Sequence, residues 1–178
     1  MTHKHEDGQE CEGCRSGLSK KEFQAQTIER LKGFIETEGM AIINIEGTCA
    51  YSVGRAAKGQ PELYLGPAMG GFANRIFNDI NIAGIAITHG GKIPAGTIEG
   101  LHYDVYTFNV TQKLRPENVG YANMSEFSEG RPVAFFELVF ADDKNLMPWE
   151  PSYDTNFDQR TVFGPRVMRE IVEGGITH

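Results

Sequence analysis

The sequence has few cysteines, no long apolar run and no excess of basic residues, and each shortage excludes a class of protein. Three cysteines in 178 residues are too few, and an odd number, for the paired disulfides of a small secreted domain. No stretch of about 20 apolar residues is present to cross a membrane. The first residues are polar and charged, unlike the apolar centre of a signal peptide. We therefore expect a cytoplasmic protein without membrane contact.

The charge balance argues against direct nucleic-acid binding. Only 17 residues are basic and 24 are acidic, which gives a net charge of −7. A chain of this charge repels a phosphate backbone, and no local cluster of Lys and Arg offsets the repulsion. Glycine-rich phosphate-binding motifs are also missing. The expected partner is another protein, with a small ligand as the alternative.

The apolar content is sufficient for one folded domain. Hydrophobic residues make up 40% of the chain and aromatic residues 10%, whereas a disordered chain would have fewer. We expect a single α+β domain, with a mostly antiparallel sheet packed by two or three helices. Its parts are a flexible or metal-binding segment at 1–17, the domain at 18–164, and a short helix or tail at 165–178.

Local patterns predict the order of helices and strands. Ser19 and Glu22 have the spacing of a capping box, an apolar stripe of 3.6-residue period follows, and Gly39 ends the helix. Pro67 opens a second helix with Phe72, Ile76, Phe77 and Ile80 on its buried face. Short helices are expected at 116–127 and 165–173, the segment 82–88 is ambiguous, and the glycines of 90–100 indicate a loop. Strands are expected at 40–45, 49–53, 62–65, 102–110 and 132–140.

Two segments carry a family resemblance. The first reads CAYSVGR at 49–55 and continues as GQPELYLG at 59–66. The second reads FELVFADDKNLMPWEPSY at 136–153, with Gln159 downstream. Together they resemble the bacterial and phage family called domain of unknown function 4262 over roughly residues 18 to 164, although Arg55 stands where a leucine is common. The resemblance implies an α+β domain and brings no established activity. More loosely, the strand pattern is similar to Suppressor-of-fused-like domains, which are protein-binding and immunity modules.

The amino-terminal segment contains the residue types that zinc prefers. His3 and His5 could approach an ion already held by the thiolates of Cys11 and Cys14, and a Cys₂His₂ set would be a structural zinc site. The alternative is a segment with two free thiols, because the single CxxC has no second pair at zinc-finger spacing.

Two residues on predicted strands could carry chemistry. Strand alternation places Glu137 on the face of Phe135 and Val139. If that face is buried, the carboxyl group must be paired or its pKa must rise, as in a general acid or base; we expect instead a solvent-exposed carboxylate. Cys49 shares a face with Tyr51, and we expect it to be a core residue rather than a nucleophile.

Two further polar residues are weaker catalytic candidates, and a third is a candidate for anion binding. His102 and Asp104 lie two residues apart on a predicted strand, where a His–carboxylate pair could transfer protons, although a surface pair is the commoner outcome. Arg55 follows Gly54 and could bind an anion beside a flexible backbone.

The segment from Met147 to Tyr153 is stiffened by two prolines and carries large aromatic side chains. Trp149 and Tyr153 have the composition of a recognition surface. We favour the alternative that they form an aromatic clip that closes one end of the sheet, and both roles are compatible.

Three functions follow from these observations. The first is a protein-binding or immunity module in bacterial or phage conflict, and it is the one we favour. The second is a small hydrolase or nucleotide-acting enzyme that uses His102, Asp104, Glu137 and Arg55. The third is a small-ligand sensor walled by Tyr51, Trp149 and Tyr153. The enzyme requires its polar residues to converge in one pocket.

Overall fold

A computed structural model describes residues 17–45, 48–66, 70–85, 87, 90–99, 101–157 and 159–174. In chain order the elements are α2 (Lys20–Glu38), β1 (Ala41–Ile45), β2 (Cys49–Val53), the 3₁₀ helix η1 (Ala56–Lys58), β3 (Glu62–Leu65), α3 (Gly70–Ile82), β4 (Gly91–Ile93), β5 (Val105–Asn109), the 3₁₀ helix η3 (Pro116–Val119), α4 (Ser125–Ser128), β6 (Phe135–Phe140) and α5 (Pro165–Gly174). No helix within these ranges has the length and apolar character that a membrane crossing would require.

The strands form one six-stranded sheet in the order β1-β2-β3-β6-β5-β4. All neighbours are antiparallel except β3 and β6, which are parallel. The expected α+β domain with a mostly antiparallel sheet is confirmed. The two segments that carry the family resemblance are neighbours in its centre, since Tyr64 of β3 lies opposite Glu137 of β6.

The helix α2 begins and ends as the sequence predicts. The backbone N–H of Glu22 donates to the Ser19 hydroxyl, and the Glu22 carboxylate accepts from the Ser19 backbone N–H at 2.9 Å, which completes the capping box. Gly39 adopts a left-handed conformation with φ of 83° and closes the helix on the carbonyl of Ile35. The inner face of α2 buries Thr27 and Leu31.

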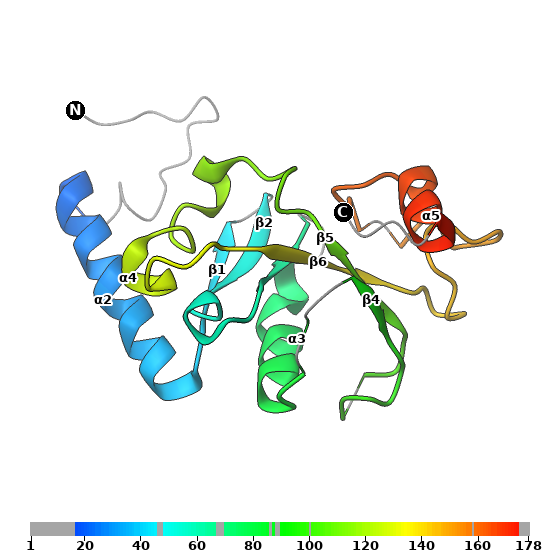
Figure 1. Cartoon of the computed structure of the whole chain (residues 1–178), viewed down its shortest axis with the longest axis horizontal. Helices are drawn as coiled ribbons and strands as arrows, with labels where there is room; N and C mark the ends of the chain where they lie inside the picture. Colours follow the sequence, from blue (N-terminus) through cyan, green and yellow to red (C-terminus); the bar gives the residue numbers. More distant parts are fainter. Residues whose placement is uncertain are drawn as a thin grey trace.

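Two separate apolar cores lie on the two faces of the sheet. Figure 1 shows α2 and α3 on opposite sides of β1. On one face α3 buries Ile76, Phe77 and Ile80, and Ile87 and Leu101 pack into the same core. The other face is covered by α2, by the segment of η3 and α4, and by the tail that ends in α5. Because three chain segments share that second face, it is where residues distant in sequence meet.

The structure corrects the expected elements in three places. The segment 90–100 contains a short strand, β4, which a three-residue run that starts with glycine cannot announce by alternation. The strand β5 begins at Val105, so His102 and Asp104 precede it. The expected helix at 116–127 is split into η3 and α4 by a turn around Gly120.

Candidate functional site

Glu137 is buried in the middle of the sheet. Its side chain is 1% exposed, so the expectation of a solvent-exposed carboxylate is wrong. The reason lies 25 residues downstream, where the backbone N–H of Val162 donates to both carboxyl oxygens at 2.9 and 3.0 Å. Burial raises the pKa of Glu137 to about 8, against the smaller opposite effect of this hydrogen bond. Glu137 therefore carries a proton at neutral pH.

The tail reaches Glu137 because it passes directly over the end of β3. A methyl group at Gly66 would lie 2.4 Å from the carbonyl oxygen of Arg160 and 3.0 Å from that of Gln159. Only a residue without a side chain allows this approach. Gln159 then binds the backbone of Phe140 on β6: its side-chain oxygen accepts from the Phe140 N–H at 2.7 Å, and its amide donates to the Phe140 carbonyl at 2.5 Å. The closing glutamine of the family signature thus attaches the tail to strand β6 through two hydrogen bonds.

Tyr64 connects Glu137 to Cys49. Its ring lies on the same face as Glu137, and a hydrogen bond joins its hydroxyl to the thiol of Cys49. Cys49 is 1% exposed, as expected for a core residue, and burial raises the pKa of its thiol. A thiol of raised pKa in an apolar core is a poor nucleophile.

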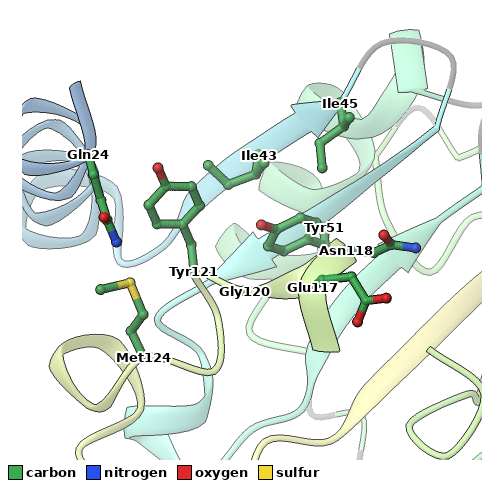
Figure 2. A pocket seen from close by; sticks show the side chains of 9 residues that line it. All are labelled: Gln24, Ile43, Ile45, Tyr51, Glu117, Asn118, Gly120, Tyr121 and Met124. Carbon is green, nitrogen blue, oxygen red and sulfur yellow. The ribbon is translucent and has the colours of Figure 1, made fainter. Parts of the chain in front are cut away.

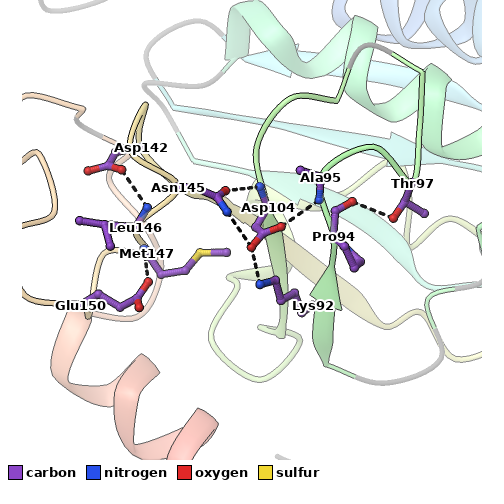
Figure 3. Close-up of polar contacts among 10 residues, drawn as sticks. All are labelled: Lys92, Pro94, Ala95, Thr97, Asp104, Asp142, Asn145, Leu146, Met147 and Glu150. Carbon is purple, nitrogen blue, oxygen red and sulfur yellow. Dashed lines mark hydrogen bonds and ion pairs between the residues drawn. The ribbon is translucent and has the colours of Figure 1, made fainter.

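Asp104 is held in a polar network at the β4 end of the sheet (Figure 3). Its carboxylate forms an ion pair with Lys92 and accepts from the backbone N–H of Ala95 at 2.8 Å and from the side-chain amide of Asn145 at 3.1 Å. The hydrogen bond from Lys92, helped by those from Ala95 and Asn145, lowers the pKa of Asp104. His102 is exposed beside it. The network ties the turn after β4 to the turn after β6.

Glu62, within the first signature segment, organises the turn after β2. The backbone N–H groups of Gly54 and Ala56 both donate to one carboxyl oxygen at 2.9 Å. The hydroxyl of Ser52 lies 2.5 Å from the other oxygen and accepts from the N–H of Leu63. Burial raises the pKa of Glu62 in spite of these donors. The serine and glutamate of the signature therefore form a structural hydrogen-bond network, called here the Ser52–Glu62 network.

Arg55 lies next to the Ser52–Glu62 network. It is 4% exposed and its Nε donates to the carbonyl of Pro61 at 3.0 Å. Burial lowers the pKa of Arg55, and the nearby Glu62 opposes that effect. Its guanidinium lies among protein groups rather than at an open surface.

The four residues of the enzyme hypothesis do not meet. Glu137 lies opposite Phe108 of β5, and Asp104 precedes Phe108 by four residues, just before that strand begins. At the rise of a β-strand this separates them by roughly 13 Å. Arg55 lies at the turn after β2, and His102 is exposed in the segment that precedes β5. The described residues thus give the enzyme hypothesis no assembled catalytic centre.

Trp149 packs against the sheet, and Tyr153 binds the tail that follows it. Trp149 is 9% exposed and its ring meets those of Tyr106 and Phe108 edge to face, at centroid distances of 5.4 and 5.6 Å. The Tyr153 hydroxyl donates to the carbonyl of Phe157 and accepts from the amide of Gln159. This is the arrangement of a clip that closes one end of the sheet.

Asp142 forms the turn that leads into this clip. Its carboxylate accepts from the backbone N–H groups of Lys144 and Leu146 at 2.9 Å and of Asp154 at 2.8 Å. Burial alone would raise the pKa of Asp142, but these three hydrogen bonds outweigh it and the pKa is lowered. The aspartate of the second signature is therefore a turn former, which leaves no coordination site to assign to it.

An open pocket of about 350 Å³ lies at the other end of the same face, between α2 and the turn from η3 to α4 (Figure 2). Its walls come from three segments that are distant in sequence. It is lined by Gln24, Ile43, Ile45, Tyr51, Glu117, Asn118, Gly120, Tyr121 and Met124.

The pocket has an apolar floor and a polar rim. Ile43 and Ile45 of β1 project into it, and Ile45 is 38% exposed. Tyr51 forms its base, where a hydrogen bond joins the phenol to the backbone of Tyr121; burial raises the pKa of this phenol. The side chains of Gln24 and Glu117 reach solvent at its edges. This composition, with a few polar groups around an apolar centre, is that of a binding site.

Of the pocket residues, the sequence singled out only Tyr51. The others sit on a helix, an outer strand and an irregular turn, and nothing in their spacing links them. One local signal was available: Tyr121 and Met124 are large residues of apolar character in the short stretch after Pro116.

The candidate zinc ligands His3, His5, Cys11 and Cys14 lie outside the described residues. Within the ranges that the structure describes, no group of three or more His, Cys, Asp and Glu side chains is placed to hold a metal ion. The structural zinc therefore stays a prediction for the amino-terminal segment.

Comparison with known proteins gives one match. No curated protein and no solved structure matches the chain. A family model described as Domain of unknown function (DUF4262) matches residues 34–154. This range contains the Ser52–Glu62 network, the Asp142 turn and most of the pocket residues. The match covers more than half of the chain and confirms the resemblance of the two signature segments. The chain belongs to the domain of unknown function 4262 family.

Proposed function

We propose that this protein is a binding module that captures a segment of another polypeptide in the pocket between α2 and the η3–α4 turn. The observation that carries the proposal is the pocket itself. It is apolar at its centre, open to solvent, and bordered by amide groups that suit a peptide backbone. The buried side chains of Glu62, Glu137 and Gln159 all have hydrogen-bond partners within the described part of the fold, whereas the pocket is open to solvent.

The open form of the pocket favours a polypeptide over a small metabolite. A volume of about 350 Å³ is at the low end for a drug-sized ligand, which an enclosed site would bury almost completely. It is ample for one side chain of a bound segment. Ile45, an exposed apolar residue on the outer strand β1, extends the contact surface beyond the pocket.

Of the three aromatic residues in the sensor hypothesis, one lines this pocket. Tyr51 lines the pocket, whereas Trp149 packs on Tyr106 and Phe108 of the sheet and Tyr153 binds Gln159. A small ligand could share the pocket but would not use those two aromatic residues.

We place the module in the cytoplasm, in bacterial or phage conflict, as a binding or immunity protein. This setting is supported by the low cysteine content and by the likeness of the strand pattern to Suppressor-of-fused-like domains. The pocket supports the binding function, and the setting rests on the cysteine content and the strand pattern.

The test is a selection from a random 12-residue peptide library on the immobilised protein, followed by affinity measurements on two variants. Ile45→Trp fills the pocket without a change of charge. Ile82→Trp makes the same change on the far face, where Ile82 of α3 is 83% exposed. We expect selected peptides to lose about tenfold or more in affinity for Ile45→Trp and to bind Ile82→Trp as they bind the wild type. A selection without enrichment, or equal binding to both variants, contradicts the proposal.

A further inference from the structure

The two ends of the pocket differ in chemistry. In Figure 2, Tyr121 and Met124 lie at one end, Glu117 and Asn118 at the other, and Tyr51 between them. Tyr121 and Met124 are half-buried, with the uncharged amide of Gln24 beside them, whereas Glu117 and Asn118 are exposed. A side chain that lies along the pocket therefore needs an apolar stem and a polar head.

We infer that the pocket takes an arginine side chain of the captured segment, with its methylene stem over Tyr51 and Met124 and its guanidinium at Glu117 and Asn118. This inference rests on the proposed function and names the residue that the pocket recognises. Arginine buries its three methylene groups on apolar surface and keeps its charged head in contact with water.

The head group matches the acidic end of the pocket. Glu117 carries the one formal charge among the described residues that line the pocket, and that charge is negative. A guanidinium can donate two parallel hydrogen bonds to a carboxylate and a further one to the amide oxygen of Asn118. An ammonium would meet the carboxylate as a point charge and could not bridge both groups in this planar way.

The charge of the whole chain acts in the same direction. A net charge of −7 attracts a basic segment over distances of about a Debye length, before any contact forms. An acidic segment would be repelled by the same field. A basic polypeptide is therefore the partner that both the pocket and the molecule favour.

The test uses three acetylated and amidated pentapeptides with the sequence Ala-Ala-X-Ala-Ala, in which X is arginine, citrulline or norleucine. Citrulline has the shape of arginine without its charge, and norleucine has the stem alone. Binding is followed by titration of the amide resonances of the ¹⁵N-labelled protein. We expect the arginine peptide to shift the resonances of Ile43 and Tyr121 and to bind at least about fivefold more tightly than the citrulline peptide.

Two variants with the same change of net charge separate local from global attraction. Glu117→Gln removes the carboxylate at the pocket, and Glu99→Gln removes one from an exposed turn outside it. We expect Glu117→Gln to abolish the preference for arginine over citrulline and Glu99→Gln to preserve it. Equal binding of arginine and citrulline, equal effects of the two variants, or an absence of pocket shifts overturns the inference.

The outcome is distinguishable from failure of the proposed function. If norleucine shifts the pocket resonances and binds more tightly than arginine, the pocket captures an apolar anchor, so the binding function stands and the arginine assignment falls. If the library selection yields no pocket-dependent peptide, the binding function itself falls.

Discussion

Glu62 and Glu137 lie on the same face of the sheet and are equally buried, at 0% and 1% exposure, yet their surroundings are opposite. Glu62 has three donors, from Ser52, Gly54 and Ala56, which belong to the turn that it closes. Among the described residues, Glu137 has one backbone N–H donor, that of Val162, which is shared by its two oxygens. The comparison teaches that burial alone does not assign a role to a carboxyl group. Burial raises the pKa of both carboxyl groups, and the number and origin of their donors distinguish their structural roles: Glu62 organises its own turn, whereas Glu137 joins the sheet to the tail.

The largest effect is expected from removal of the better-satisfied group. Glu62→Ala leaves two buried backbone N–H groups and the Ser52 hydroxyl without their acceptor, and each unsatisfied group costs about 1–3 kcal/mol. We expect the free energy of unfolding to fall by about 3–5 kcal/mol, measured by urea denaturation at pH 7.

A matched variant separates the hydrogen bonds from the lost volume. Glu62→Gln keeps one oxygen at the position that accepts from Gly54 and Ala56. Its cost should be less than half that of alanine. If the alanine and glutamine variants lose the same free energy of unfolding, or if the alanine variant loses less than about 1 kcal/mol, the Ser52–Glu62 network does not stabilise the fold. The contrast with Glu137 then fails.

The difference between the two carboxyls also explains how far the sequence could lead. Glu62 sits in a local signature whose partners, Ser52 to Ala56, are within ten residues. The two strands that flank this turn were predicted from the sequence, as were the capping box of α2 and the strand β6, whereas the hydrogen bonds of Glu62 were not. Alternation likewise put Glu137 on the face of Phe135 and Val139, which the second core confirms.

The error on Glu137 came from a long-range contact. Whether its face meets solvent depends on Val162, and on Gly66 as the position that lets the tail pass. No periodicity within β6 carries that information. The pocket was missed for the same reason, because Gln24, Ile43 and Tyr121 are neighbours only after three segments have folded onto one face.

The second prediction concerns the proton on Glu137. Its pKa is about 8 in the folded protein against an ordinary value of 4.5. Between these values the folded state binds a proton that the unfolded state has lost. The contribution to stability is thus complete below pH 4.5 and is lost as the pH rises toward 8, at up to about 1.4 kcal/mol per pH unit.

Glu137→Gln removes the titration and keeps an oxygen for the Val162 N–H. We expect this variant to match the wild type near pH 5 and to exceed its free energy of unfolding by about 2–4 kcal/mol at pH 8. Urea denaturation at four pH values between 5 and 8 measures the slope. A residual slope is expected from Glu62, whose pKa is also raised. Parallel slopes for wild type and variant would show that Glu137 is ionised when folded.

The smallest effect is expected from Gly66→Ala, which tests whether the tail is what keeps Glu137 dry. The new methyl group would lie 2.4 Å from the Arg160 carbonyl oxygen, so the tail must move away from the end of β3. We expect a loss of about 1–3 kcal/mol, as for other overpacked positions. Gly33→Ala on α2 is the control, because nothing lies within 4 Å of its added methyl group and alanine favours a helix.

Gly66→Ala should also move the pKa of Glu137 back toward 4.5, because a displaced tail admits water to the carboxyl group and lessens the cost of its ionisation. Carbon-13 resonances of the side-chain carboxyl, followed between pH 4 and 9, report this directly in both variants. A lost stability with an unchanged pKa would mean that Phe108 and Tyr64, rather than the tail, exclude water from Glu137. In that case the contrast with Glu62 would originate within the sheet itself.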